Sequence, residues 1–355
     1  MVHISPLYFG DRSYVGGGER YATSLAASMA ERVDTTLVTF GPVRDGFRQG
    51  RLRVEVYPAI VRPDATVTPL APYSFLRQVL RADVVHCHQY KSLTVALAAM
   101  ASAALGKHVF LTDEGGGGGY WLAQKLPLSD VVDTLLPIST FSAEPLPRFR
   151  RVRTIYGGVD GRFLAGEIKP ARDRAGQALF VGRLLPHKGI NYLIEAIDGD
   201  TRLDIIGRAY SESYFALLQA LATHKQVHFN THASDADIIS AYRTSLVTVL
   251  PSVYVDVNGF RQLAPELLGL VLLESMACGT PVICAAVGGM PEFVEEGVTG
   301  FVVPPNDPAA LRERIGYLIS NPRVAVDMGR NGRRKVLEEF TWNKVVERCL
   351  AAYRT

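Results

Sequence analysis

The sequence predicts an α/β protein made of two doubly wound domains, each built on a parallel sheet. The chain has 355 residues, which exceeds the length that one hydrophobic core usually organises. Short apolar runs alternate with amphipathic segments of helix length, which is typical of a parallel sheet covered by helices on both faces. This pattern occurs twice along the chain, so we expect two such sheets.

The first series of apolar runs lies in the N-terminal half of the chain, and the second series begins at residue 178. The first comprises expected strands 2–9, 36–40, 84–87 and 108–112 with helices 19–32 and 93–104. The second comprises expected strands 178–182, 203–207, 227–229, 247–251 and 282–285 with helices 190–197, 215–222, 238–242 and 270–278. Each half of the chain is therefore expected to form one α/β unit.

A polar segment separates the two series. Residues 167–176 are polar and contain a proline, as expected of an interdomain connector. We place the domains at 1–168 and 169–340 on this basis. Because doubly wound sheets bind ligands at the carboxyl ends of their strands, two such domains facing a central cleft would bind a ligand there.

Composition excludes several classes of protein. The 38 Lys and Arg residues nearly balance the 35 Asp and Glu residues, which argues against a nucleic-acid binder. The four cysteines show no paired metal spacing and no secretory leader is evident, so we expect a reduced, cytoplasmic protein. Apolar runs fall short of the ~20 residues that span a bilayer. The basic clusters 148–153 and 330–335 are either solvated faces or sites of peripheral membrane contact at most.

The segment 265–279 places one carboxylate before a glycine and a second inside an apolar helix. Gly269 allows a backbone to pass close to a ligand, and the unpaired N–H groups of the helix starting at Leu270 favour a phosphate. Glu274 falls near the second turn and can accept hydrogen bonds from a sugar ring, while Glu266 lies in the preceding loop. The alternative is an amphipathic helix with two water-facing glutamates.

Two cations follow the first strand of the second series. Arg183 and Lys188 lie on one loop, between Gly182 and Gly189, and together could neutralise a departing diphosphate without a metal. The alternative is a pair of solvated cations near a turn. The flanking glycines favour ligand contact.

The glutamate pair and the residues after it, 276–283, resemble the retaining family-4 glycosyltransferases. The resemblance covers nearly the whole chain. Each matching segment is modest alone, but the order of the segments along the chain is specific. The other segments that carry it are 16–20, 180–184, 187–189, 287–289 and 296–304. The resemblance implies the GT-B fold, a nucleotide-activated sugar donor and transfer with retention at the anomeric carbon.

The resemblance also implies roles for particular residues. In the second domain, Arg183 and Lys188 would bind the donor phosphates, and the backbone of Gly269, Leu270 and Val271 would cap them. Glu274 would hold the ribose, and Glu266 would contact the donor sugar as a catalytic residue. The second domain would thus bind the nucleotide sugar.

For the first domain, the resemblance implies the acceptor side, with a C-terminal helix within 341–355 packing back on it. The backbone of Gly16, Gly17 and Gly18 would approach the donor, although a flexible turn is the alternative. This glycine run does not fit the dinucleotide fingerprint, so no nicotinamide cofactor is expected.

One position departs from the family pattern. Many members have a histidine near the transferred sugar at the second position after the threonine that ends the strand, and here Glu114 follows Thr112 and Asp113. A carboxylate there could accept a hydrogen bond from the sugar or stabilise positive charge at the anomeric carbon, so we predict a catalytic role for Glu114.

Other acceptor-side candidates are His88, Tyr120 and Trp121. The two aromatic residues follow a run of five glycines, which indicates either a mobile acceptor loop or a disordered surface loop. His86 and His88 point the same way on a strand, but no third or fourth ligand lies nearby in the sequence. We therefore predict no metal site, and a structural role for His88 is the alternative to acceptor binding.

These observations together predict a metal-independent, retaining glycosyltransferase that moves a sugar from a nucleoside-diphosphate donor to an acceptor hydroxyl. No cofactor is expected beyond the donor, a UDP-sugar more readily than a GDP-sugar. The acceptor is a small molecule, glycan or lipid-linked group. The alternatives are a nucleotide-sugar epimerase of the same fold and a non-catalytic nucleotide-sugar binder.

Overall fold

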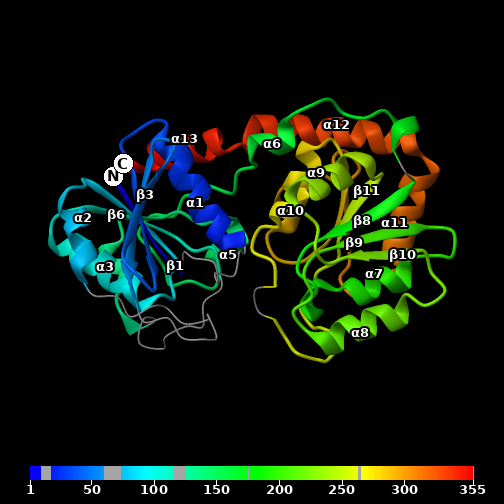
Figure 1. Ribbon diagram of the computed structural model, residues 1–355, viewed down its shortest axis with the longest axis horizontal. Coiled ribbons are helices and arrows are strands. Elements are labelled where there is room, and N and C mark those ends of the chain that lie inside the picture. The colour runs from blue at the N-terminus through cyan, green and yellow to red at the C-terminus, as the bar shows by residue number, and fades with distance from the viewer. Residues whose placement is uncertain (9–16, 60–72, 116–124, 175, 263–264, 355) are drawn as a thin grey trace. The chain divides into compact units, whose positions relative to one another are not determined.

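The computed structural model describes residues 1–8, 17–59, 73–115, 125–174, 176–262 and 265–354. The chain forms two compact units, which we call unit 1 (Met1–Gly158 with Trp342–Thr355) and unit 2 (Val159–Thr341) (Figure 1). The first unit ends at residue 158, earlier than the expected boundary at 168. The difference arises because helix α6 (Gly161–Leu164) packs on helix α10 (Leu270–Ala277) of unit 2.

Unit 1 is built on a seven-stranded sheet in the order β3-β4-β2-β1-β5-β6-β7. Its strands are β1 Val2–Tyr8, β2 Thr36–Gly41, β3 Asp45–Gln49, β4 Leu52–Pro58, β5 Val84–His88, β6 His108–Thr112 and β7 Thr134–Leu135. All neighbouring pairs are parallel except β3 and β4. The antiparallel β3 was not expected from the sequence, because every residue of it is exposed and Phe47 alone does not make an apolar run.

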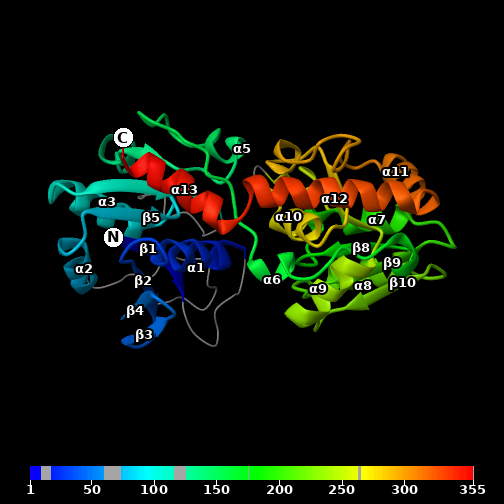
Figure 2. The same ribbon diagram turned by 90° about the horizontal axis from the view of Figure 1, so that it is seen from above.

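Unit 1 contains short helices and two longer ones before the C-terminal helix. They are α1 Gly17–Ala30, η1 Tyr73–Phe75, α2 Leu76–Leu80, α3 Leu93–Ala104, α4 Leu128–Val131, α5 Thr140–Ala143 and α13 Trp342–Tyr353. Helix α13 packs beside α1 although 312 positions separate Ala30, which ends α1, from Trp342, which begins α13, as Figure 2 shows. The ring of Trp342 meets that of Tyr21 edge-on, with centroids 5.1 Å apart. The C-terminal helix is thus part of unit 1.

Unit 2 is built on a six-stranded, wholly parallel sheet in the order β10-β9-β8-β11-β12-β13. Its strands are β8 Gln177–Val181, β9 Arg202–Ile206, β10 Val227–Asn230, β11 Val247–Leu250, β12 Val282–Ala285 and β13 Gly300–Val303. Every residue of β8, β11 and β12 is buried. These strands read as short apolar runs because helices cover both faces of a parallel sheet.

The helices of unit 2 cover both faces of this sheet (Figure 1). They are α6 Gly161–Leu164, η3 Ala171–Asp173, η4 Pro186–Lys188, α7 Ile190–Ala196, α8 Glu212–Leu221, α9 Asp235–Thr244, α10 Leu270–Ala277, η5 Met290–Glu292, α11 Pro308–Ser320 and α12 Pro322–Glu339. Sequence signals set several starts; α9, for example, begins at a capping box formed by Ser234 and Asp237. None of the helices in the described ranges is both long and apolar enough to cross a membrane.

The basic cluster 330–335 is largely engaged within unit 2. Arg330 pairs with Asp327, Arg333 donates to the carbonyl oxygen of Leu164, and Lys335 pairs with Glu295. Arg330 therefore pairs within α12, while Arg333 and Lys335 hold the helix against its own unit.

Both sheets reverse their strand order at one place. In unit 1 the reversal lies between β1 and β5, and in unit 2 it lies between β8 and β11. Doubly wound sheets bind ligands beyond the carboxyl ends of the strands at this point, because the loops there diverge and leave a crevice. The residues that follow β1, β5, β8 and β11 are therefore the candidates for ligand binding.

Candidate functional site

In unit 2, glycine brings the loops that follow β8 and β11 together. Gly189 ends η4 with φ 67°, and a Cβ atom at this position would overlap the carbonyl oxygen of Pro251. The N–H of Val253 donates to the carbonyl oxygen of His187 at 2.9 Å, which ties the same two loops. Lys188 is thereby held at the point where the strand order reverses.

Lys188 and Glu266 form an ion pair at this point. Their side chains are 11% and 14% exposed, and Ser252 Oγ donates to the same carboxylate oxygen at 3.4 Å. Sequence reasoning gave these two residues separate roles, and the structure brings them together although 78 positions separate them. By contrast, Arg183 is exposed, and its guanidinium pairs with no described residue.

The backbone of Glu266 rests on the loop after β12. The N–H of Gly289 donates to the Glu266 carbonyl oxygen at 3.1 Å, and a Cβ atom on Gly288 would overlap that same oxygen. The N–H of Gly288 donates in turn to the hydroxyl of Tyr254 at 3.0 Å. Two glycines and a tyrosine therefore fix Glu266, and the tyrosine carried no recognisable signal in the sequence.

Helix α10 starts where the sequence predicts. Gly269 precedes it with φ 84°, and no side chain caps its first N–H groups. Leu270 and Val271, the first two residues, are half-buried. Glu274 lies in the second turn and accepts a hydrogen bond from the Tyr242 hydroxyl at 3.2 Å. The helix thus presents uncapped N–H groups at its start and an oriented carboxylate one turn later.

His187 lies beside this group and is uncharged near neutral pH. Burial lowers its pKa to about 4, and the positive charge of Lys188 acts in the same direction against the opposing pull of Glu266. The local cations are therefore Lys188 and Arg183 rather than the imidazole. The surroundings of the β8 loop thus favour an anion.

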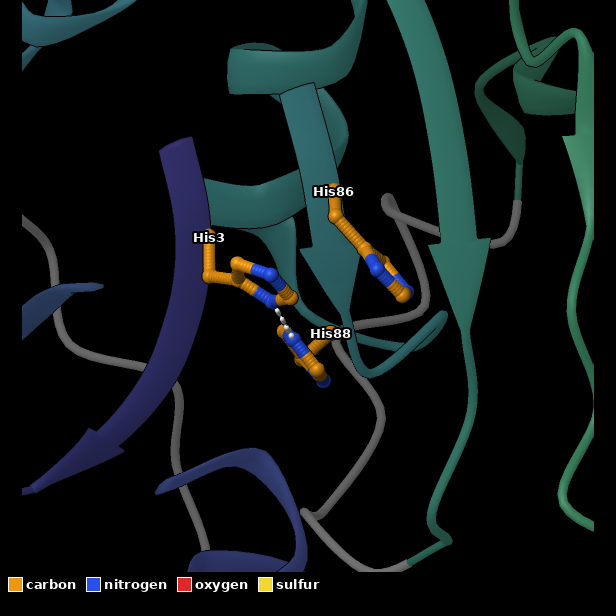
Figure 3. A group of neighbouring side chains, drawn as sticks. All are labelled: His3, His86 and His88. Carbon is orange, nitrogen blue, oxygen red and sulfur yellow. Dashed lines mark hydrogen bonds between the residues drawn. The ribbon is translucent and has the colours of Figure 1, made fainter. Parts of the chain in front are cut away.

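In unit 1, three buried histidines meet beside the reversal point (Figure 3). His3 comes from β1, while His86 and His88 come from β5, and one ring nitrogen of each lies within 4.8 Å of the others. The sequence shows no third ligand near His86 and His88, and the structure brings one, His3, from a distant strand. His3 lies 85 positions before His88, and only the pairing of β1 with β5 brings it there. The signal for this third residue in the sequence was a histidine within the apolar first strand.

The geometry of these rings suits hydrogen bonding better than a shared metal ion. His86 and His88 are stacked with an interplanar angle of 12°, and nitrogen lone pairs lie in the ring planes, so the two cannot converge on one ion without reorienting. Both nitrogens of His86 also have partners already, the Tyr353 hydroxyl at 2.7 Å and Thr112 Oγ1 at 2.8 Å. His86 therefore links α13 to β6.

Glu114 is the partner of His88. Its Oε1 lies 2.5 Å from His88 Nδ1, and its side chain is 1% exposed. Gly18, in the first turn of α1, lies against it, since a Cβ atom there would be 3.5 Å from Glu114 Cβ. Gly17 begins that helix. Of the other predicted residues, Gly16, Tyr120 and Trp121 lie outside the described residues.

Known proteins are similar to this chain in sequence. Residues 15–162 match the family model described as Glycosyltransferase Family 4, and residues 167–335 match that of Glycosyl transferases group 1. The D-inositol 3-phosphate glycosyltransferase 1 of Catenulispora acidiphila is 30% identical over 82% of this chain and 78% of its own. The α-maltose-1-phosphate synthase of Mycolicibacterium smegmatis is 28% identical over 96% of this chain and 95% of its own.

Solved structures show the same architecture. Anabaena HepE in complex with UDP superposes with a TM-score of 0.77 at 18% identity, covering 99% of both chains. The sucrose-phosphate synthase of Thermosynechococcus elongatus gives 0.73 at 20% identity, covering 99% of this chain and 98% of its own. With two parallel-sheet α/β units and both family models matched in order, the chain belongs to the family-4 glycosyltransferases of GT-B fold.

Proposed function

We propose that this glycosyltransferase takes its sugar from a nucleoside-diphosphate donor and transfers it to an acceptor hydroxyl with retention of anomeric configuration. The observation that carries the proposal is the group formed by Lys188, Glu266 and the uncapped start of α10 where the unit 2 sheet reverses. Similar solved structures are described as complexes with UDP or UDP-glucose, which supports a UDP-sugar as donor.

The charges of unit 2 fit a diphosphate leaving group. The ammonium of Lys188 and the guanidinium of Arg183 would balance its negative charge, and the first N–H groups of α10 would bind its oxygens. We propose that these groups stand in for a metal ion and that no further cofactor is needed. Glu274, oriented by Tyr242, would accept hydrogen bonds from the ribose hydroxyls.

The Lys188–Glu266 pair couples the two ends of such a donor. A diphosphate competes for the ammonium that Glu266 holds, and the carboxylate released can then accept a hydrogen bond from the transferred sugar. Binding of phosphate would thus prepare Glu266 for the sugar. A free sugar without phosphate would leave the pair intact.

We propose the following transfer step for retention. The bond between the anomeric carbon and the leaving phosphate oxygen breaks, and the acceptor oxygen bonds to that carbon from the same face. The acceptor proton passes to the departing phosphate oxygen, so charge and protons balance. The cations of unit 2 stabilise the phosphate while positive charge develops on the sugar.

Thermal unfolding with UDP, GDP and ADP tests the donor. A ligand at 100 times its dissociation constant stabilises the folded protein by about 2.7 kcal/mol, so the correct nucleotide should raise Tm while the others raise it less. Absence of any shift with all three would contradict the proposal. Lys188→Ala is the test variant and Lys335→Ala is its matched control, because each removes a lysine paired to a glutamate in unit 2.

Product analysis separates this function from its alternatives. An epimerase would convert UDP-glucose to another UDP-sugar without an acceptor, and a non-catalytic binder would be stabilised by it without turnover. A transferase releases UDP when an acceptor is supplied, and retention is read from the anomeric proton coupling of the product. An inverted product would overturn the proposed step while leaving the donor assignment in place.

A further inference from the structure

A chain of hydrogen bonds runs from β1 to the loop after β6 in unit 1. His3 Nδ1 lies 2.9 Å from His88 Nε2, and His88 Nδ1 lies 2.5 Å from Glu114 Oε1 (Figure 3 shows the histidines). Both imidazole rings and the carboxylate are buried. One histidine of the cluster, His86, belongs instead to the separate link between Tyr353 and Thr112.

The direction of the protons in this chain follows from counting donors. His3 Nε2 is buried and has no hydrogen-bond partner among the described residues. A buried N–H without an acceptor costs more than a buried acceptor without a donor, so the proton of neutral His3 belongs on Nδ1. His3 then donates to His88 Nε2, and His88 donates from Nδ1 to Glu114. Every N–H is satisfied only in this direction, and it requires Glu114 to accept as a carboxylate.

The electrostatic setting agrees with this assignment. Burial lowers the pKa of His3 well below its ordinary value, and a charge on His88 would lower it further, so His3 is neutral. The Cβ of Glu114 lies against Gly18 in the first turn of α1, so the side chain is rooted near a helix start, where the dipole favours negative charge. Burial together with the charge of Glu114 raises the pKa of the adjoining Asp113 to about 6.

One atom of the chain is left over. Glu114 Oε2 is buried and has no hydrogen-bond partner among the residues that the structure describes. An unsatisfied carboxylate oxygen costs free energy that only a donor can recover, and a sugar ligand offers hydroxyl donors. The chain thus fixes one oxygen of Glu114 internally and leaves the other without an internal partner.

We propose that His88 and His3 are positioning residues that hold the Glu114 carboxylate in one orientation, with Oε2 accepting a hydrogen bond from a hydroxyl of a bound sugar. The inference rests on the proposed function for the identity of the ligand, a hydroxylated donor sugar or acceptor. Glu114 touches the ligand, and the two histidines act through it. His3 thereby acquires a role although it never meets the substrate.

Nuclear magnetic resonance of the ligand-free protein with ring-labelled histidine tests the chain itself. We expect His3 and His88 each to carry a proton on Nδ1, with the His88 proton strongly deshielded by the carboxylate. Glu114→Gln should move that proton upfield. A proton on Nε2 of His88 in the wild-type protein would overturn the proposal without any variant.

Matched variants separate positioning from packing. His3→Asn keeps a donor near the place of Nδ1, whereas His3→Leu removes it and leaves His88 Nε2 unpaired. We expect His3→Leu to shift the His88 nitrogen resonances and His3→Asn to restore them at least in part. His108→Gln is the control, because His108 is an exposed histidine of unit 1 that pairs only with Asp133. Equal effects of His3→Leu and His3→Asn would contradict the positioning role.

Calorimetric binding identifies the hydroxyl. We compare UDP, UDP-glucose and D-inositol 3-phosphate as probes in the wild-type protein and in Glu114→Gln. Loss of the acceptor should weaken UDP-glucose or the inositol phosphate about tenfold and leave UDP unchanged, and the probe affected tells whether the hydroxyl belongs to donor or acceptor. If the wild-type protein binds a probe and Glu114→Gln binds it equally well, the ligand role is overturned. If the wild-type protein binds none of the three probes, the proposed function fails. The resonance data still test whether the hydrogen-bond chain exists.

Discussion

The two units place polar groups at the same topological position but give them opposite character. In unit 2 the reversal point carries the partly exposed ion pair of Lys188 and Glu266 beside uncapped N–H groups. In unit 1 it carries fully buried imidazoles and the carboxylate of Glu114. The strand order decides where a site forms, and the side chains on the following loops decide which ligand it suits. An anion fits unit 2, and a hydroxyl group fits unit 1.

The units also differ in how their loops are held. Unit 2 relies on glycines that allow backbone to meet backbone, as Gly189 does at Pro251 and Gly288 does at Glu266. Unit 1 relies on side-chain hydrogen bonds, such as that between His86 and Tyr353. Variants should therefore damage the two units by different means, and the following predictions run from the largest expected effect to the smallest.

The largest effect is expected from Lys188→Ala. Removal of the ammonium takes away charge that balances the leaving diphosphate, and we expect UDP release from UDP-glucose to fall about 10²- to 10³-fold. The measurement is the initial rate of UDP release. Lys335→Ala, whose lysine pairs with Glu295 on α12, should keep a rate near that of the wild-type protein. Similar rates for both variants would show that the unit 2 site is misassigned.

A backbone change at Gly189 should destabilise unit 2 strongly. Alanine there meets the Pro251 carbonyl oxygen and must also adopt a positive φ, which together cost about 2–4 kcal/mol. Gly199→Ala is the control, because a Cβ atom at Gly199 would meet no atom within 4 Å. Urea unfolding followed by circular dichroism should show a lower midpoint only for Gly189→Ala. Equal midpoints would mean that the two loops do not meet as described.

Acidification should affect unit 1 through its neutral histidines. Burial holds the pKa of His3 and His86 well below 6.5, so each takes up a proton only on unfolding. Their contribution to stability is complete above about pH 6.5 and is lost as pH falls, by up to about 1.4 kcal/mol per pH unit for each histidine. Asp113 has the opposite sign: its pKa of about 6 lies above the ordinary value of 3.8, so its contribution is lost as pH rises through 4 to 6.

Tryptophan fluorescence is the appropriate probe of this effect. The chain has two tryptophans, and both fall within the residues of unit 1. The unfolding free energy that they report should fall as pH drops below 7, and below pH 6 it should fall less steeply than two histidines alone would make it fall, because Asp113 offsets one histidine. In Asp113→Asn the decline below pH 6 should be steeper. A free energy independent of pH would contradict the burial of uncharged histidines.

Local sequence signals predicted much of the fold. The apolar runs of β8, β11 and β12 were recognisable because helices cover both faces of the sheet and every residue of these strands is buried. The start of α10 was recognisable because Gly269 adopts a positive φ that other residues disfavour. These features depend only on neighbours in sequence.

Local sequence signals could not predict the contacts between segments that lie far apart in the sequence. Lys188 meets Glu266, and His3 meets His88, only because strands far apart in sequence become neighbours in the sheet. The boundary at 158 was missed for a similar reason, since Phe163 of the short helix α6 contacts Cys278 at the end of α10. Pairing order, rather than composition, determines which polar side chains share a site.

The smallest expected effect separates the hydrogen bond from the packing of α13. Tyr353→Phe keeps the ring against Phe110 but removes the hydroxyl that bonds His86 Nδ1 at 2.7 Å, leaving a buried nitrogen without its partner. We expect a loss of about 1–2 kcal/mol in the free energy of unfolding reported by tryptophan fluorescence. Tyr317→Phe is the control, because Tyr317 is an exposed tyrosine of α11 in unit 2. A wild-type midpoint in Tyr353→Phe would show that packing alone holds α13, and the contrast between a glycine-held unit 2 and a hydrogen-bonded unit 1 would then fail.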